Sequence, residues 1–146
     1  MIRAGDPTLN LAILLELAYK KLDATLMDRL RANGYDDLRP AHSQVFGAIA
    51  PEGSRVGEMA AQAGITQQSM SELVDGLERL GYVERRDDPT DRRARIVAFT
   101  DRGWEAVRAG VATVNAIEHE WAELIGVRRA SALRSALEAI AVGDGS

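Results

Sequence analysis

The order of local structural signals between residues 56 and 99 constrains the fold more than any other feature. Residues 56–63, VGEMAAQA, have a helical pattern that ends at Gly64, which suits the left-handed conformation found after a helix. Thr66 then supplies an N-cap for a second helix. Its apolar residues recur at the spacing of one helical face: Met70, Leu73, Val74, Leu77 and Leu80. Two helices joined by so tight a turn predict a helix-turn-helix.

A β-hairpin is expected directly after the second helix. Residues 82–85 and 94–99 are rich in β-forming side chains, and the run DDPTDRR between them carries an Asp-Pro turn signal. A hairpin that follows a helix-turn-helix is a wing. The sequence therefore predicts a winged-helix core over residues 38–104.

Further helices are predicted before, within and after this core. Asp6-Pro7 is expected to open a helix over residues 7–32, and Pro40 to begin a helix of about one dozen residues. Thr100 is expected to cap a helix that runs to about Ile125, and a last helix follows Gly126. The whole chain, 1–146, is then a single domain that is mainly α with a small β-hairpin wing. The tail GDGS is expected to be frayed.

The terminal helices, residues 7–32 and 105–142, are amphipathic on faces that a core of this size cannot cover. Pairing the chain ends of two protomers about a two-fold axis would bury those faces. Two reading helices would then meet two half-sites of a pseudo-palindrome. We therefore expect a homodimer.

Composition excludes several classes of protein. The chain has no cysteine, which rules out disulfides and thiolate metal sites. His42 and His119 do not fall in a metal-ligand pattern, and no phosphate-binding loop or nucleophile motif occurs, so no metal, cofactor or enzymatic activity is expected. No apolar run approaches the ~18 residues of a membrane helix. With no secretory signal at the N-terminus, a cytoplasmic protein is expected.

Charge is segregated along the chain. The net charge is −4, which argues superficially against nucleic acid. Between Arg85 and Arg95, however, five arginines stand against three aspartates, so that this segment is +2 and the remainder −6. The positive segment coincides with the predicted wing, as a DNA-binding surface requires. A solvated charged loop would look similar.

Short polar side chains occupy the exposed face at the start of the second helix of the helix-turn-helix. Side chains of this kind hydrogen-bond to base edges in the major groove. The candidates for DNA contact are Gln67, Gln68, Ser69 and Ser71. The alternative is an ordinary solvated helix face.

The segment from Leu73 to Gly103 resembles the MarR family of bacterial winged-helix transcriptional regulators, and the resemblance extends over nearly the whole chain. Its most specific part is DPTDRR followed by a strand and then Thr100-x-x-Gly103. The resemblance implies a homodimer with the fourth helix in the major groove and the wing in the minor groove. It also implies a repressor that is often released by a small aromatic or phenolic ligand, bound between the dimerisation and DNA-binding regions.

The same resemblance assigns roles in the wing. Asp91 is expected to orient Arg93 into the minor groove, where an arginine meets enhanced negative potential, and Arg92 is a further contact. The weaker candidates, for contact with phosphate or for pairing with Asp87 and Asp88, are Arg85, Arg86 and Arg95.

Two further expectations concern base preference and ligand binding. Many family members carry Arg or Lys where this chain has Glu72, so half-site preference cannot be transferred. His42 lies next to the family's ligand region; Phe46 and Tyr19 are ligand candidates too, although aromatic residues are more often core or dimer-seam residues.

The sequence thus favours a sequence-specific regulator that binds double-stranded DNA. One alternative is a winged helix used for protein–protein interaction without an operator, which the acidic net charge and Glu72 would suit. Another is a DNA-binding regulator that responds to no ligand. Affinity that falls steeply with salt distinguishes DNA binding from the first alternative.

Overall fold

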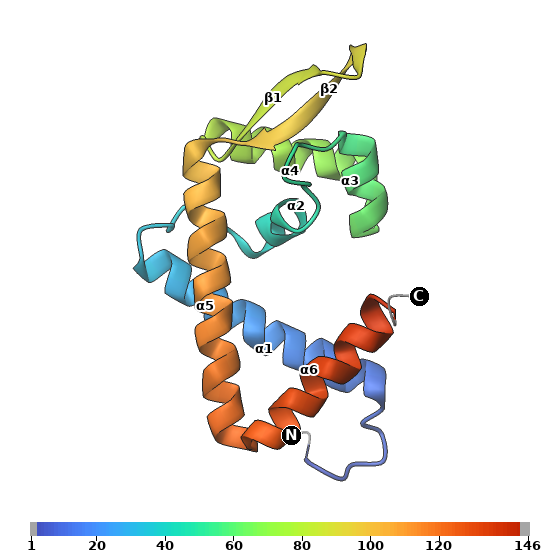
Figure 1. Ribbon diagram of the computed structural model, residues 1–146, viewed down its shortest axis with the longest axis vertical. Helices are drawn as coiled ribbons and strands as arrows, with labels where there is room; N and C mark the ends of the chain where they lie inside the picture. The colour runs from blue at the N-terminus through green and yellow to red at the C-terminus, as the bar shows by residue number, and fades with distance from the viewer. Residues whose placement is uncertain (1–2, 144–146) are drawn as a thin grey trace. The chain divides into compact units, whose positions relative to one another are not determined.

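The computed structural model describes residues 3–143 and confirms a mainly helical chain with one two-stranded antiparallel hairpin. Figure 1 shows the elements in order. They are α1 (Leu11–Ala32), the 3-10 helix η1 (Pro40–His42), α2 (Ser43–Phe46), α3 (Val56–Ala63), α4 (Gln67–Arg79), β1 (Val83–Asp88), β2 (Asp91–Phe99), α5 (Asp101–Ile125) and α6 (Val127–Ala141).

The chain forms two compact units. One unit runs from Met27 to Gly110 and holds the winged helix; the other combines the segment up to Leu26 with the segment from Val111 onward. Helices α1 and α5 each have one end in the first unit and the other end in the second. The predicted DNA-binding residues all lie in the first of these.

The winged-helix unit is organised around α4. Its side chains Met70, Val74 and Leu77 have no exposed surface, and neither do Met59 of α3 and Tyr82 at the start of the wing. Helix α4 packs against α3, against β1 and against η1. The 3.6-residue spacing of apolar side chains thus places one face of α4 in the core and leaves the opposite face in solvent.

The helix-turn-helix is confirmed. Helix α3 ends at Gly64, which adopts the left-handed conformation at φ 70°, where a side chain would be strained. Thr66 caps α4, its hydroxyl oxygen accepting a hydrogen bond from the Ser69 N–H at 3.0 Å. These local signals fix the turn between the two helices and hence the exposed face of α4.

The hairpin is longer than the sequence predicts. Most of the segment 87–93, expected as a turn, is strand: Asp88 pairs with Asp91, and only Pro89 and Thr90 form the tip. An irregularity in the register lies between Asp87 and Asp88. Ser54 extends the pairing on the other side of β2, because its N–H and C=O bond with Val97 at 3.0 and 2.8 Å.

Two helix boundaries differ from expectation. The first helix begins at Leu11 rather than at Pro7, because the Asp6 carboxylate binds the N–H and hydroxyl of Thr8 in a turn. The side chain of Asn10 accepts from the N–H of Ile13 at 3.0 Å and is the cap instead. The helix expected from Pro40 is also shorter and ends at Gly47. The tail was expected to be frayed, but its residues after Gly143 lie outside the part of the chain that the structure describes.

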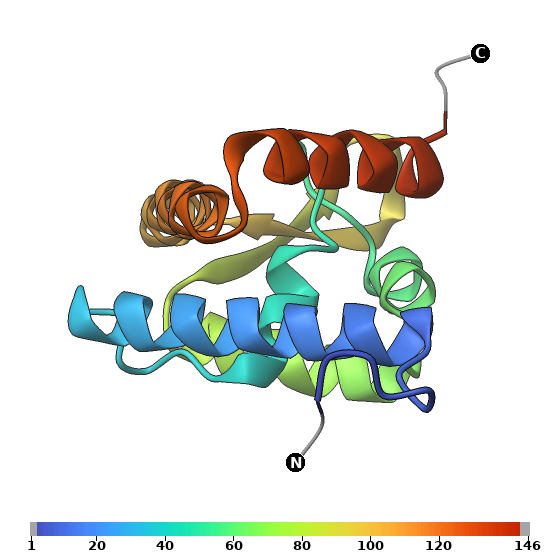
Figure 2. The ribbon, with the colours of Figure 1, turned by 90° about the horizontal axis from the view of Figure 1, so that it is seen from below.

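The unit formed by the chain ends has little core of its own. Ile117 and Thr113 of α5 are buried, and Arg134 of α6 forms an ion pair with Glu118 of α5 at 3.3 Å. The chain turns sharply from α5 into α6 at Gly126, as Figure 2 makes clear. No helix among residues 3–143 is long and apolar enough to cross a membrane.

Candidate nucleic-acid interface

The first turn of α4 presents polar groups to solvent. Gln67, Gln68 and Ser69 are exposed, whereas Ser71 is partly buried. The first turn holds no acidic residue, so the partial positive charge of the helix N-terminus is not offset there. Such a terminus favours a phosphate group, whose oxygens accept from free backbone N–H groups.

The four polar side chains of this turn differ in how free they are. The Thr66 hydroxyl donates to the Ser69 hydroxyl oxygen at 2.8 Å. The amide oxygen of Gln67 lies over the start of α3, 3.6 Å from where a Cβ on Gly57 would be. Gln68 makes no such contact and has the exposed Glu72 one helical turn away on the same face.

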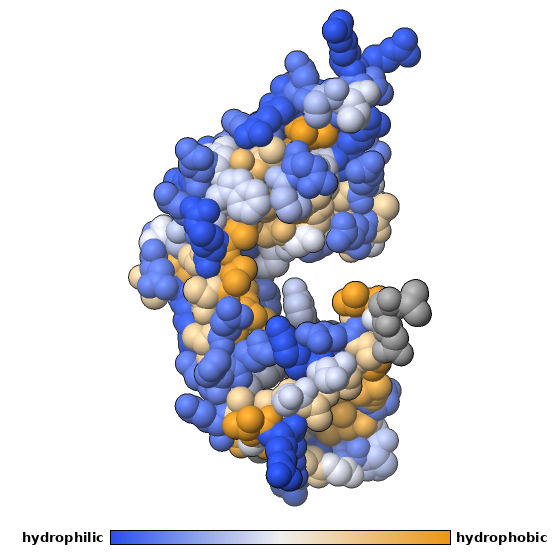
Figure 3. All heavy atoms as spheres, in the orientation of Figure 1, coloured by the Kyte–Doolittle hydropathy of each residue, from blue (hydrophilic) through white to orange (hydrophobic). Residues whose placement is uncertain are grey.

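The wing carries two arginines without partners. Arg92 and Arg93 follow the hairpin tip at the start of β2 and are exposed, and neither side chain forms an ion pair or hydrogen bond with any residue in the range 3–143. In the space-filling view, hydrophilic side chains project from the hairpin (Figure 3). Two long cations are therefore free to meet an anionic partner.

The remaining arginines of the hairpin have partners within the unit. Arg85 binds Asp75 and Glu78 of α4 at 2.7 and 2.9 Å and thereby ties β1 to the helix. Arg86 pairs with Glu84 in its own strand. Arg95 donates to the backbone carbonyl of Arg85 at 3.2 Å. None of the three uses Asp87 or Asp88, the partners considered from the sequence.

Asp91 contacts Arg93 through the backbone. Its carboxylate accepts from the N–H of Arg93 at 2.9 Å, which shapes the first residues of β2 rather than the guanidinium itself. The carboxylate also lies 3.8 Å from the guanidinium of Arg55. An effect of Asp91 on Arg93 would thus act through the direction of the main chain, and its role in DNA binding stays a prediction.

Asp88 anchors the hairpin tip. One carboxylate oxygen accepts from the N–H and hydroxyl of Thr90 at 2.8 and 2.7 Å. The other accepts from Nε of Arg55 at 2.9 Å and forms an ion pair with Nη2 of the same guanidinium at 2.8 Å. These hydrogen bonds, first those from Thr90 and then that from Arg55, lower the pKa of Asp88 from 3.8 to about 2. The carboxylate stays ionised and holds the turn.

Sequence reasoning missed Arg55. It is the N-cap residue of α3 and stands next to Ser54, which pairs with β2, so its side chain reaches the wing. Its partner Asp88 is 33 residues further along the chain. No local pattern links the two positions. The signal that could have been used is an arginine directly before α3, close to the predicted wing.

A second missed network lies at the base of the wing. The Tyr82 hydroxyl donates to Asp37 at 2.5 Å, and Arg102 donates to the same carboxylate at 2.8 Å while its guanidinium carbon lies 4.5 Å from the centre of the Tyr82 ring. Burial, and then the hydrogen bond to Asp37, raise the pKa of Tyr82 to about 12. The three side chains join the segment after α1, the start of β1 and the first turn of α5.

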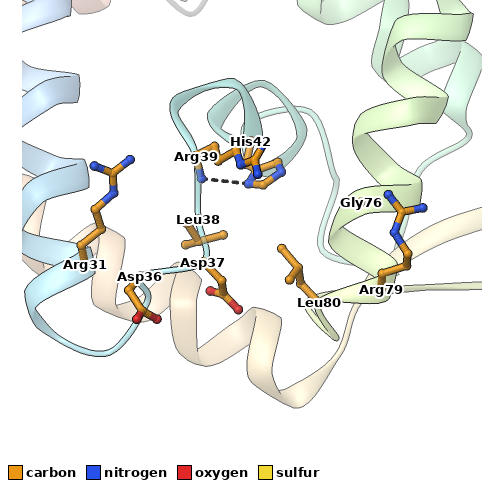
Figure 4. A pocket seen from close by; sticks show the side chains of 9 residues that line it. All are labelled: Arg31, Asp36, Asp37, Leu38, Arg39, His42, Gly76, Arg79 and Leu80. Carbon is orange, nitrogen blue, oxygen red and sulfur yellow. Dashed lines mark hydrogen bonds between the residues drawn. The ribbon is translucent and has the colours of Figure 1, made fainter.

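The ligand candidates named from the sequence are not brought together. His42 lines a pocket of about 480 Å³ between the end of α1, the segment 36–39 and the C-terminal half of α4 (Figure 4). Phe46 does not line it and instead stacks on Phe99, with ring centres 5.5 Å apart. Tyr19 is exposed on the part of α1 that belongs to the other unit. Over residues 3–143 no cluster of side chains could hold a metal ion.

Comparison with known proteins identifies the family. Residues 36–94, which span the helix-turn-helix and the hairpin tip, match the model of the MarR family. The structure of CouR from Rhodococcus jostii RHA1 bound to p-coumaroyl-CoA is similar over 94% of both chains, with a TM-score of 0.69 and 26% identity. These matches support a MarR-family winged-helix transcriptional regulator.

Two further matches are to a bacterial transcriptional regulator and to a second structure of CouR. A segment of 41 residues is 44% identical to the uncharacterized HTH-type transcriptional regulator YcgE of Bacillus subtilis strain 168; it covers 28% of this chain and only 27% of YcgE. The transcriptional repressor CouR bound to a 23-mer DNA duplex covers 97% of this chain and 99% of its own, with a TM-score of 0.70 at 24% identity. At that identity the likeness concerns the fold alone.

Proposed function

We propose that this MarR-family chain is a transcriptional repressor that binds a pseudo-palindromic operator as a homodimer. The observation that carries the proposal is the pair of exposed, unpartnered arginines, Arg92 and Arg93, on a hairpin whose tip is held by Asp88 and Arg55. A fixed hairpin with free cations suits the minor groove, whose negative potential is strongest where it is narrow. The repressor CouR, whose structure was determined on a 23-mer DNA duplex, has the same fold as this chain.

In this proposal α4 enters the major groove with its N-terminal turn first. Gln68, whose exposed side chain forms no hydrogen bond with residues 3–143, reads base edges, and Gln67, Ser69 and Ser71 contact bases or phosphates nearby. Glu72 lies one turn further along the same face. It cannot neutralise phosphate, but it can accept a hydrogen bond from a cytosine amino group.

The homodimer is supported by apolar side chains that the single chain leaves in solvent. Along α1 and from the end of α5 through α6, large apolar residues are at least 36% exposed: Leu11, Leu14, Leu15, Leu17, Tyr19, Leu124, Ile125, Val127, Leu133, Leu137, Ile140 and Val142. Apolar residues, in orange, are visible over α6 in Figure 3. Monomeric proteins rarely expose apolar surface on this scale, and a second copy of the same faces would cover it.

Sedimentation tests the dimer. The wild-type protein is expected at twice the chain mass of 15.8 kDa. Ile140→Glu places a charge at a residue that is 78% exposed in the single chain, so the protomer itself is not disturbed, and this variant is expected to shift toward monomer. A wild-type protein that sediments as a monomer at micromolar concentration would contradict the dimer.

The proposal includes release from the operator by a small ligand, with the aromatic and phenolic class as the first to test. The similar protein CouR was determined with p-coumaroyl-CoA bound. A ligand would act by binding better to a dimer geometry in which the reading helices no longer match half-sites about one DNA turn apart. Titration of operator-bound protein with aromatic acids and their thioesters should release DNA; no release would remove that ligand class.

Operator binding is tested with Arg93→Ala in a gel-shift or anisotropy titration. The DNA probes are the fragments of genomic DNA that the wild-type protein retains. The loss of a minor-groove arginine is expected to weaken binding by about 1–3 kcal/mol. Arg86→Ala is the matched control, because it removes the same charge from the same hairpin but from a guanidinium already paired with Glu84. If Arg93→Ala binds like the wild type, the minor-groove role of Arg93 is wrong. If the affinity of the wild type neither falls with salt nor depends on sequence, the operator assignment fails and the protein-interaction alternative is favoured.

A further inference from the structure

The pocket beside the C-terminal half of α4 has an unusual lining. Its volume of about 480 Å³ falls within the range of small-molecule sites, about 300–1,000 Å³. Arg31, Arg39, Arg79 and His42 line it together with two aspartates, and no aromatic side chain does. All of these residues belong to the winged-helix unit. The lining is therefore suited to charge rather than to an aromatic ring.

His42 directs a hydrogen-bond donor into this pocket. The side chain is 8% exposed, and its Nδ1 accepts from the backbone N–H of Arg39 at 3.0 Å, as the dashed line in Figure 4 indicates. In a neutral imidazole the hydrogen then sits on Nε2, for which the described residues offer no acceptor. Burial, and then the charge of Arg39, lower the pKa of His42, which favours the neutral ring.

Gly76 leaves room beside that donor. A Cβ atom on Gly76 would lie 3.9 Å from Nε2 of His42 and 3.9 Å from a terminal guanidinium nitrogen of Arg79. Both donors therefore border one small space on the face of α4. Any side chain at position 76 would occupy it.

Positive charge around this space is in excess. Arg31, Arg39 and Arg79 form no ion pair with a carboxylate among residues 3–143. Of the two aspartates, Asp37 is already bound by Tyr82 and by Arg102. Among the residues that line the pocket, Asp36 is thus the one carboxylate without a partner for three guanidinium groups.

We propose that this pocket binds the oxyanion of a small molecule, a carboxylate or a phosphate, between His42 and Arg79 over the bare Cα of Gly76. Arg31 and Arg39 add charge at the edge. Guanidinium and N–H donors to an oxyanion give short, charge-assisted hydrogen bonds, about twice as strong as neutral ones. As the site of the effector the pocket rests on the proposed function; as an anion site it does not.

The binding experiment uses the full-length protein without DNA, in a buffer with chloride as the only other anion. Inorganic phosphate and acetate are titrated separately while the ring resonances of His42 are followed by NMR. Saturable shifts with phosphate assign a phosphate group, and saturable shifts with acetate assign a carboxylate. Linear, non-saturating shifts with both anions overturn the proposal.

Two variants localise the site. Arg79→Gln keeps a polar side chain but removes the charge, and Gly76→Ala fills the space between the donors; each is expected to weaken anion binding by about ten-fold or more. Gly76→Ala should also raise the melting temperature, because alanine favours a helix interior, so its loss of binding cannot be ascribed to misfolding. Arg108→Gln, the same charge change on an exposed residue of α5, is the control.

The outcomes separate this proposal from operator binding. Unchanged anion affinity in both pocket variants contradicts the pocket and leaves the DNA proposal standing. Anion binding that is lost in Arg79→Gln and Gly76→Ala but kept in Arg108→Gln supports the pocket, even if no operator is found.

Discussion

Arg55 and Asp88 are 33 residues apart in the chain, yet Nε of the guanidinium donates to one carboxylate oxygen at 2.9 Å and Nη2 forms an ion pair with the same oxygen at 2.8 Å. The other oxygen of Asp88 binds Thr90 in the hairpin tip. One arginine at the start of α3 thus holds the turn from which Arg92 and Arg93 follow. The relation connects the helix-turn-helix to the wing, the two parts that must fit one DNA site together.

Arg55→Gln is expected to weaken operator binding several-fold without unfolding the protein, because the hairpin tip loses its anchor while the core is unchanged. Anisotropy titrations at two salt concentrations measure the effect. Arg108→Gln, with the same loss of charge on α5, should bind like the wild type. If both variants lose affinity equally, the effect is one of net charge and the anchoring role of Arg55 is wrong.

The pH dependence of stability should report on Asp88. Its pKa falls from 3.8 in the unfolded chain to about 2 in the folded protein, so the folded state favours the ionised form. The resulting stabilisation is complete above about pH 4 and is lost as the pH falls from 3.8 through 2. Denaturant unfolding of wild type and Asp88→Asn should therefore differ at pH 5 and converge toward pH 2. A difference that stays constant over this interval would contradict the assignment.

The helix-turn-helix was predictable because its signals are local. The caps Gly64 and Thr66 and the apolar spacing of α4 act within a few residues, and the structure has the predicted boundaries. The hairpin length was not predictable, because aspartate and arginine are poor β-formers. The strands are extended by backbone pairing instead, which continues to Asp88 opposite Asp91.

The candidate site divides in the same way. The sequence pointed to Arg92 and Arg93, and the structure leaves both exposed and unpartnered within residues 3–143. The sequence did not distinguish these two arginines from Arg85, whose partners lie on α4. The spacing of residues along the chain does not show how a strand and a helix lie against each other. The pocket around His42 was missed for the same reason: its arginines come from three separate segments.

Tyr82→Phe tests the network at the base of the wing. Removing the hydroxyl leaves Asp37 with Arg102 alone, so the free energy of unfolding is expected to fall by about 1–2 kcal/mol, discounted because the carboxylate is partly exposed. The ring itself is kept, so its packing against Phe46 should not change. Chemical denaturation measures the loss. A variant as stable as the wild type would mean that water replaces the hydroxyl at no cost.

Gly103→Ala tests why the family signature has glycine three residues after Thr100. The Thr100 hydroxyl donates to the carbonyl of Gly81 at 2.6 Å and accepts from the N–H of Gly103 at 3.1 Å. A Cβ on Gly103 would overlap the carbonyl oxygen of Tyr82, which is backbone and cannot rotate away. Either α5 or the start of β1 must move, and we expect the protein to lose about 1–3 kcal/mol of stability.

Gly110→Ala is the matched control for this substitution. Gly110 lies in the same helix, and beyond the neighbouring backbone of that helix no atom of residues 3–143 lies within 4 Å of a Cβ placed there. Alanine should therefore stabilise the protein by about 0.5–1 kcal/mol through helix propensity. The two variants are therefore expected to differ in the sign of the change in melting temperature. Equal changes in both would show that the contact with Tyr82 does not limit position 103, and that Gly103 serves another purpose in the signature.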